Sequence, residues 1–80
     1  MSYTVHTLEQ LGPVLKGLRK AQNLTQKEVG DAVDMLPKTV SKLELEPDTA
    51  TVDSLFKLLS ALQLEVVLQS RQQESSTREW

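Results

Sequence analysis

Residues 24–44 read Leu-Thr-Gln-Lys-Glu-Val-Gly-Asp-Ala-Val-Asp-Met-Leu-Pro-Lys-Thr-Val-Ser-Lys-Leu-Glu, and they contain two helix starts separated by about a dozen residues. At the first start, the Thr25 hydroxyl can accept a hydrogen bond from the first helical turn while Glu28 reaches back to the Thr25 backbone. The apolar residues that follow lie at the i, i+3 and i+4 positions of one helix face: Val29, Ala32 and Val33. We therefore expect a helix that begins at Thr25 and packs on a neighbouring element.

The second helix start is at Pro37. The backbone φ angle of proline suits the first turn of a helix, and its missing N–H is no loss there, because N–H groups in the first turn have no partner within the helix. In the helix that follows, Val40 and Leu43 point inward, and the outward residues are polar or basic: Lys38, Thr39, Ser41 and Lys42. A short polar helix carried on a second, packed helix can enter the major groove of DNA. The stretch predicts a helix-turn-helix that reads DNA.

The chain resembles the Cro/repressor (XRE) type of helix-turn-helix domain through Leu24-Thr25-Gln26, the apolar triplet above, Thr39-Val40-Ser41 and Glu44. From about Leu11 to Leu68 it is also similar to the HipB antitoxins, the DNA-binding partners of HipA-type kinase toxins. That similarity lies in Pro47-Asp48, Thr51, Leu55-Phe56-Lys57-Leu58-Leu59, Leu62 to Leu68 and a polar tail that ends in Trp80. It implies an all-α, lambda-repressor-like domain of four to five helices, and a repressor that also holds a HipA-like kinase inactive.

The same resemblance implies roles for single residues. In this family, an arginine of the first helix pairs with the glutamate that ends the helix inserted into the major groove. The resemblance therefore implies a structural pair of Arg19 and Glu44. Gln26 is expected to bind a DNA phosphate, as a helix start there offers its amide and backbone N–H groups. The departures from the family pattern are Gly30 for alanine, Asp34 for the turn glycine, which Asp tolerates, and Pro37 for a base-reading glutamine.

The residues that we predict to contact DNA are Thr25, Gln26, Lys27, Pro37, Lys38, Thr39, Ser41 and Lys42. Within this set, we expect Lys38 to donate to guanine and Thr39 to meet a thymine methyl group, while Ser41 and Lys42 contact bases or phosphate.

Two further helices complete the predicted core. Thr7 precedes a helix with Gln10 in the capping-box position and apolar residues at Leu8, Leu11, Leu15 and Leu18. Because an interior proline removes one backbone bond and costs about 3 kcal/mol, we expect a kink or a restart at Pro13. After an acidic loop over residues 45–50, Thr51 caps a helix with an apolar stripe: Val52, Leu55, Leu58, Leu59 and Leu62.

The segment 64–69 alternates nearly regularly and contains two β-branched valines, which favours a strand. A lone strand is not stable, so we expect it to pair with its copy in a homodimer through Leu64, Val66, Val67 and Leu68. Residues 1–69 thus form the DNA-binding domain, and residues 70–80 are expected to be a disordered tail. Trp80 either anchors this tail in a partner's pocket or is an exposed end of no consequence.

The formal net charge of −2 argues against nucleic acid binding, since DNA-binding proteins are usually basic. However, residues 1–44 hold six basic and five acidic side chains, a balance of +1, and residues 45–80 hold three basic and six acidic ones, a balance of −3. The acidic part thus lies away from the second helix of the motif. A weakly charged monomer should bind DNA poorly, so we expect a dimer on an inverted repeat.

Composition gives little support for an enzyme or a cofactor. The chain has no cysteine, one histidine at His6 and no phosphate loop, and the acidic residues near Glu46 lack the spacing of a calcium site. We expect no metal, no small-molecule substrate and no membrane span, since no apolar run approaches about 18 residues. The first residues lack the basic and apolar regions of a signal peptide, so the expected location is the cytoplasm.

Three interpretations of function remain open. The first is an antitoxin and autoregulator of a HipA-like kinase operon, the second a stand-alone or phage-type repressor, and the third a protein-interaction module with weak DNA binding. The predicted paired strand and the Trp80 tail favour the first, because a stand-alone repressor needs neither.

Overall fold

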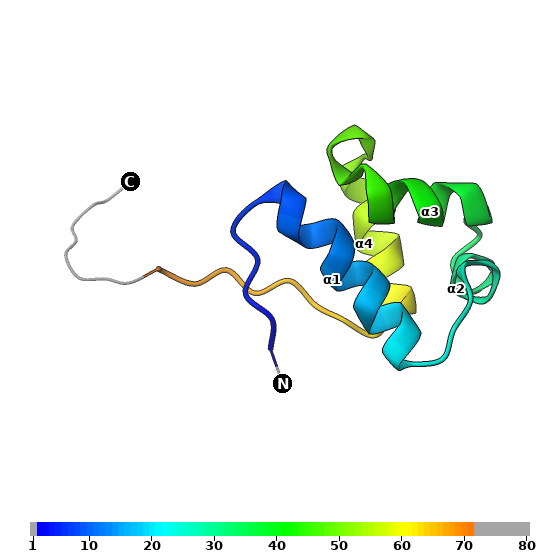
Figure 1. Cartoon of the computed structure of the whole chain (residues 1–80), viewed down its shortest axis with the longest axis horizontal. Helices are drawn as coiled ribbons and strands as arrows, with labels where there is room; N and C mark the ends of the chain where they lie inside the picture. Colours follow the sequence, from blue (N-terminus) through cyan, green and yellow to red (C-terminus); the bar gives the residue numbers. More distant parts are fainter. Residues whose placement is uncertain (1, 72–80) are drawn as a thin grey trace.

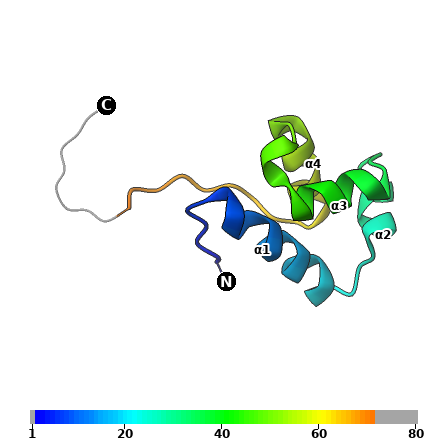
Figure 2. The same cartoon turned by 45° about the horizontal axis from the view of Figure 1, so that its top comes forward.

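The computed structural model describes residues 2–71 of the 80-residue chain. This part contains four α-helices and one 3₁₀ turn: α1 Leu8–Ala21, α2 Gln26–Ala32, α3 Pro37–Leu45, η1 Pro47–Thr49 and α4 Val52–Ala61. Helix α3 packs against both α1 and α2, and α2 also contacts α4. Figures 1 and 2 show the four helices gathered into one bundle, from which the segment after α4 runs back past the N-terminal arm. The all-α helix-turn-helix fold is thus confirmed.

The core is a single cluster of apolar side chains drawn from all four helices and the α2–α3 turn. Its fully buried members are Leu15, Val29, Val40, Leu43, Leu58 and Leu62, and Met35 is buried beside them. Because a chain of this size buries only a small core, each of these side chains accounts for a large share of the folding free energy.

Three helices end in the same way, with a non-glycine residue in the left-handed region: Asn23, Asp34 and Gln63, whose φ angles are 59°, 60° and 60°. The next residue donates its N–H back to the helix, from Leu24 to the Arg19 carbonyl (3.2 Å), from Met35 to Gly30 (2.8 Å) and from Leu64 to Leu59 (2.8 Å). These are Schellman endings, in which the residue after the left-handed one turns its apolar side chain inward. The turn at Asp34 therefore forms without glycine.

Two glycines allow helices to approach closely. A Cβ at Gly12 would overlap the carbonyl oxygen of Glu44, and a Cβ at Gly30 would overlap that of Met35. Gly30 is therefore a packing requirement, and the alanine that is usual in the family would need a shifted turn here.

Four expectations about these helices are wrong. The expected restart at Pro13 is wrong, since α1 continues through this residue; the missing N–H removes only one backbone hydrogen bond, and Gly12 and Leu15 nearby are buried. A kink at Pro13 stays a prediction. Leu8 (51% exposed) and Val52 (71% exposed) lie in first turns that extend beyond the core. Ala32 is exposed as well, because the close approach of the α2–α3 turn uses Gly30 instead.

Residues 64–71 form neither helix nor strand in this single chain. A strand that pairs only with a second subunit would show no ladder here, so the intersubunit pairing stays a prediction. Most of the tail prediction falls on residues 72–80, which lie outside the described residues.

Candidate nucleic-acid interface

Local sequence determines how α2 and α3 begin. The Thr25 hydroxyl accepts from the Glu28 N–H (3.0 Å), and the Glu28 carboxylate accepts from the Thr25 N–H (2.8 Å). Pro37 occupies the first position of α3, where no backbone donor is needed. Figure 1 shows α2 beside the N-terminal end of α3. This is the helix-turn-helix layout that residues 24–44 predict.

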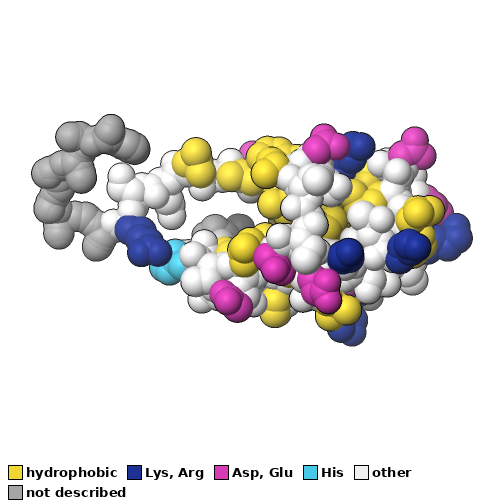
Figure 3. Space-filling model, turned by 90° about the horizontal axis from the view of Figure 1, so that it is seen from above, with side chains coloured by type: hydrophobic (Ala, Val, Ile, Leu, Met, Phe, Trp, Pro, Cys, Tyr) yellow, Lys and Arg dark blue, Asp and Glu magenta, His cyan; other side chains and the backbone are white. Residues whose placement is uncertain are grey.

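The outward side of α3 is polar, and we call its four residues the reading face: Lys38, Thr39, Ser41 and Lys42. Lys38 and Lys42 are exposed, whereas Thr39 and Ser41 are half-buried. Neither lysine forms a salt bridge with another residue in the described range. Figure 3 shows basic side chains, with acidic ones among them, at the end of the molecule where α2 and the start of α3 lie. The reading face therefore offers two cations that are free to contact an anionic surface.

The predicted contacts on α2 are already engaged within the chain to different degrees. Lys27 is exposed and donates to Asp31 one turn later (2.8 Å), and this hydrogen bond and the Asp31 charge raise the pKa of Lys27. The Thr25 hydroxyl is held by its capping role, and Pro37 is exposed at the start of α3. Lys27 thus shares its charge with Asp31, unlike the two lysines of the reading face.

Arg19 and Glu44 form the expected pair between α1 and α3. The Arg19 Nε donates to Glu44 Oε2 (2.6 Å), and Nη2 donates to Oε1 (3.2 Å). Both side chains are almost fully buried, with 8% and 2% of their surfaces exposed. A two-point contact of this kind fixes orientation as well as distance. It therefore sets the position of the last turn of α3 against α1.

Two contacts of this cluster are not predicted by the sequence pattern. Gln26 donates from Nε2 to Glu44 Oε1 (3.1 Å), and the Arg19 Nη1 donates to the Leu24 carbonyl (2.8 Å). The partners are far apart in sequence or involve the backbone, so no local spacing signals them. Leu36, which is 63% exposed at the start of α3, was also not singled out.

The predicted dimer residues lie on the segment after α4. Leu64 is half-buried against the core, whereas Val66, Val67 and Leu68 are 49%, 66% and 92% exposed. Three consecutive exposed apolar residues on an extended segment are available to a partner strand. Trp80 lies outside the described residues.

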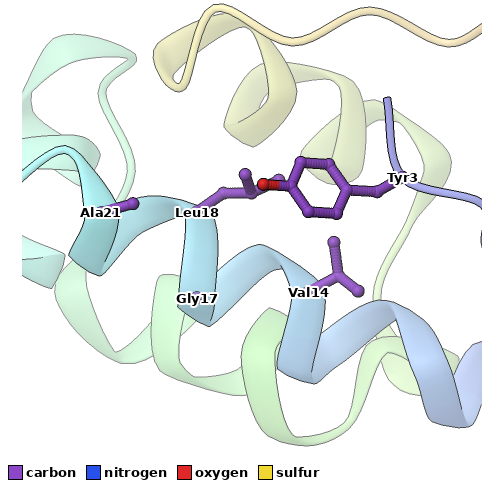
Figure 4. Close-up of a pocket in the computed structure, with 5 residues that line it drawn as sticks. All are labelled: Tyr3, Val14, Gly17, Leu18 and Ala21. Carbon is purple, nitrogen blue, oxygen red and sulfur yellow. The ribbon is translucent and has the colours of Figure 1, made fainter. Parts of the chain in front are cut away.

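Features of other kinds of site are few in residues 2–71. An apolar notch of about 260 Å³ lies between the N-terminal arm and α1, where the Tyr3 ring lies near Val14 and Leu18 (Figure 4). None of the residues that line this notch carries a charge. No group of three potential metal ligands occurs in the described range, and no helix there is both long and apolar enough to cross a membrane.

Residues 15–68 match a family model described as helix-turn-helix. Over 64 residues the chain is 30% identical to Antitoxin HipB of Escherichia coli (strain K12). The matched region covers 80% of this chain and 73% of that protein. Two solved structures, described as a HipB-O4 20mer complex and a HipA-HipB-O2-O3 complex, are each similar with a TM-score of 0.84 and 27% identity. Each similarity covers 89% of this chain and 100% of the other.

Proposed function

The chain belongs to the HipB-like antitoxins of the helix-turn-helix family, and from that premise we propose that it is a dimeric, sequence-specific DNA-binding repressor. We further propose that it acts in the cytoplasm as the antitoxin and autoregulator of a HipA-like kinase operon. The solved relatives are described as a HipB-O4 20mer complex and a HipA-HipB-O2-O3 complex, which supports both parts of this proposal.

The observation that carries the proposal is the reading face. Lys38 and Lys42 stand exposed, without an ion pair to any residue in the range 2–71, on a helix that is fixed to α1 by a buried ion pair. Base recognition requires hydrogen-bond donors on a rigid element, because a flexible element would lose conformational entropy when it binds, and this loss lowers the affinity. We assign Lys38 and Thr39 to base edges, and the phosphate contacts to Gln26, Lys27 and Lys42, with Thr25, Pro37 and Ser41 at the edge of the contact.

One subunit has too little positive charge near the DNA backbone to bind tightly, which favours a dimer. Each subunit offers only a few lysines to the DNA backbone, and the net charge of the chain is −2. Pairing of residues 64–68 with the same segment of a second subunit would double these contacts on an inverted repeat. Residues 1–69 would then be the folded unit, with residues 70–80 and Trp80 as the segment that reaches a partner.

Two experiments test the function directly. Selection of bound duplexes from a random pool should recover an inverted repeat with half-sites one helical turn apart, about 34–36 Å. Co-expression with a HipA-like kinase from the same genome should give a stable complex of the two proteins and lower the toxicity of the kinase. Recovery of no preferred sequence would remove the repressor role, and loss of the complex would leave a stand-alone repressor.

A second candidate function is protein contact with weak DNA binding. The acidic net charge and Pro37, which replaces a base-reading glutamine of the family, favour it. Under this alternative the kinase complex would form normally while DNA affinity would stay near the nonspecific level at physiological salt.

A further inference from the structure

We infer that Glu44 is a positioning residue for DNA contact, because it orients the Gln26 amide so that one N–H of this amide faces a DNA phosphate. This inference rests on the proposed function. The contact between Gln26 and Glu44 cannot be recognised from the charges of the two residues or from their spacing in the sequence.

The geometry brings three helices together at one carboxylate. Glu44 Oε1 accepts from both Gln26 Nε2 (3.1 Å) and Arg19 Nη2 (3.2 Å), and Oε2 accepts from Arg19 Nε (2.6 Å). The Glu44 side chain is 2% exposed, whereas Gln26 is half-buried. Gln26 is therefore the member of this cluster that reaches from the buried carboxylate to the surface.

The chemistry of the carboxylate decides which way the amide points. An ionised carboxylate only accepts hydrogen bonds, so the NH₂ end of Gln26 must face Glu44 and the oxygen must face elsewhere. One N–H of this NH₂ group is used by Glu44, and the second stays available. A DNA phosphate also only accepts, so this second N–H is the part of the side chain that a phosphate can use.

The segment just before Gln26 is held by the same cluster. Arg19 Nη1 donates to the carbonyl of Leu24, two residues before Gln26, while its other nitrogens bind Glu44. The start of α2 and the Gln26 side chain thus share their anchor. A donor that is ordered before DNA arrives loses less conformational freedom on binding than a free surface glutamine does.

The test is a double-mutant cycle measured on DNA binding. Gln26→Ala is made in the natural chain and in Glu44→Gln, whose neutral amide lets the Gln26 amide turn either way. The probe is a labelled duplex of about 30 base pairs of random sequence, because a phosphate contact acts on any sequence. In the natural background Gln26→Ala should weaken binding about tenfold, and in Glu44→Gln less than about twofold.

The matched control is Lys42→Ala, a proposed phosphate contact on α3 that does not touch Glu44. Its loss of affinity should be the same in both backgrounds, which separates orientation of Gln26 from a general displacement of α3. Equal losses for Gln26→Ala in both backgrounds would overturn the inference. Absence of DNA binding by the natural chain would instead overturn the proposed function, and the inference with it.

A measurement on the unmodified protein covers the case in which Glu44→Gln does not fold. In nuclear magnetic resonance spectra of the free chain, the Gln26 side-chain amide protons should show contacts with the Glu44 side chain and slowed exchange with water. Amide protons of Gln26 that exchange as fast as those of exposed Gln63 would show that Glu44 does not hold the amide, and would also overturn the inference.

Discussion

Arg19 and Glu44 join α1 to the last turn of α3 through two hydrogen bonds between buried side chains, with N–O distances of 2.6 and 3.2 Å. This pair stands behind the reading face and does not belong to it. The pair holds α3 in place against α1. A substitution in this pair should therefore change both the free energy of unfolding and the affinity for DNA.

Removal of either partner should be strongly destabilising. Arg19→Ala or Glu44→Ala leaves one buried charge without its counter-charge, and each should lower the free energy of unfolding by about 3–5 kcal/mol. The double variant should recover part of this loss, because no unpaired charge remains. Urea unfolding at one fixed protein concentration, followed by circular dichroism, measures all three.

The exposed pair of Lys57 and Asp53, whose charged atoms lie 3.4 Å apart, is the control for this cycle. Lys57→Ala should change the free energy of unfolding by less than about 1 kcal/mol. Strictly additive losses for Arg19→Ala and Glu44→Ala would mean that the two charges act independently.

The glycines of α1 provide a matched pair of substitutions within one helix. Gly12→Ala should destabilise the fold by about 1–3 kcal/mol, because the added Cβ overlaps the Glu44 carbonyl. Gly17→Ala meets nothing within 4 Å and should stabilise by about 0.5–1 kcal/mol through helix propensity. Thermal melting should place the two variants on opposite sides of the natural chain, and a stabilising Gly12→Ala would refute the close approach of α1 and α3.

The dimer interface is tested at Val66, which is 49% exposed in the single chain. Val66→Pro removes a backbone donor from the proposed strand and should shift the protein to monomers in sedimentation experiments. Val66→Thr keeps both the donor and the β-branched shape, so it should remain dimeric. An unchanged dimer in Val66→Pro would exclude pairing through this segment.

Base contacts and phosphate contacts differ in what they do to specificity. Lys38→Ala should lower the ratio of operator to random-DNA affinity about tenfold, since it removes a base contact. Gln26→Ala should weaken both affinities alike and leave the ratio within about twofold. Fluorescence anisotropy with the selected operator and a scrambled duplex measures both ratios. A similar fall of the ratio in the two variants would contradict the assignment.

Local signals predicted the parts of the fold that depend on neighbouring residues. The hydrogen bonds between Thr25 and Glu28, the start of α3 at Pro37 and the left-handed turn at Asp34 all lie within a few residues of their causes. For the same reason the order of helices and most of the core residues were predictable.

The errors concern features that depend on the whole bundle. Periodicity alone did not show that Gly30 meets the α2–α3 turn while Ala32 stays exposed, because this contact depends on where the turn brings the Met35 carbonyl. The contact between Gln26 and Glu44 joins residues 18 positions apart, so it follows only from the packed arrangement. Strand pairing of residues 64–68 depends on a second chain.

The most direct test of the central claim, a dimer that binds DNA through α2 and α3, is the salt dependence of its DNA affinity. Lys27 and Lys42 of two subunits would neutralise about four phosphates, which predicts a slope of about −4 in a plot of log affinity against log salt concentration. Anisotropy titrations on the selected operator between low and physiological salt give this slope. A slope near zero, with the chain folded and dimeric, would contradict the account.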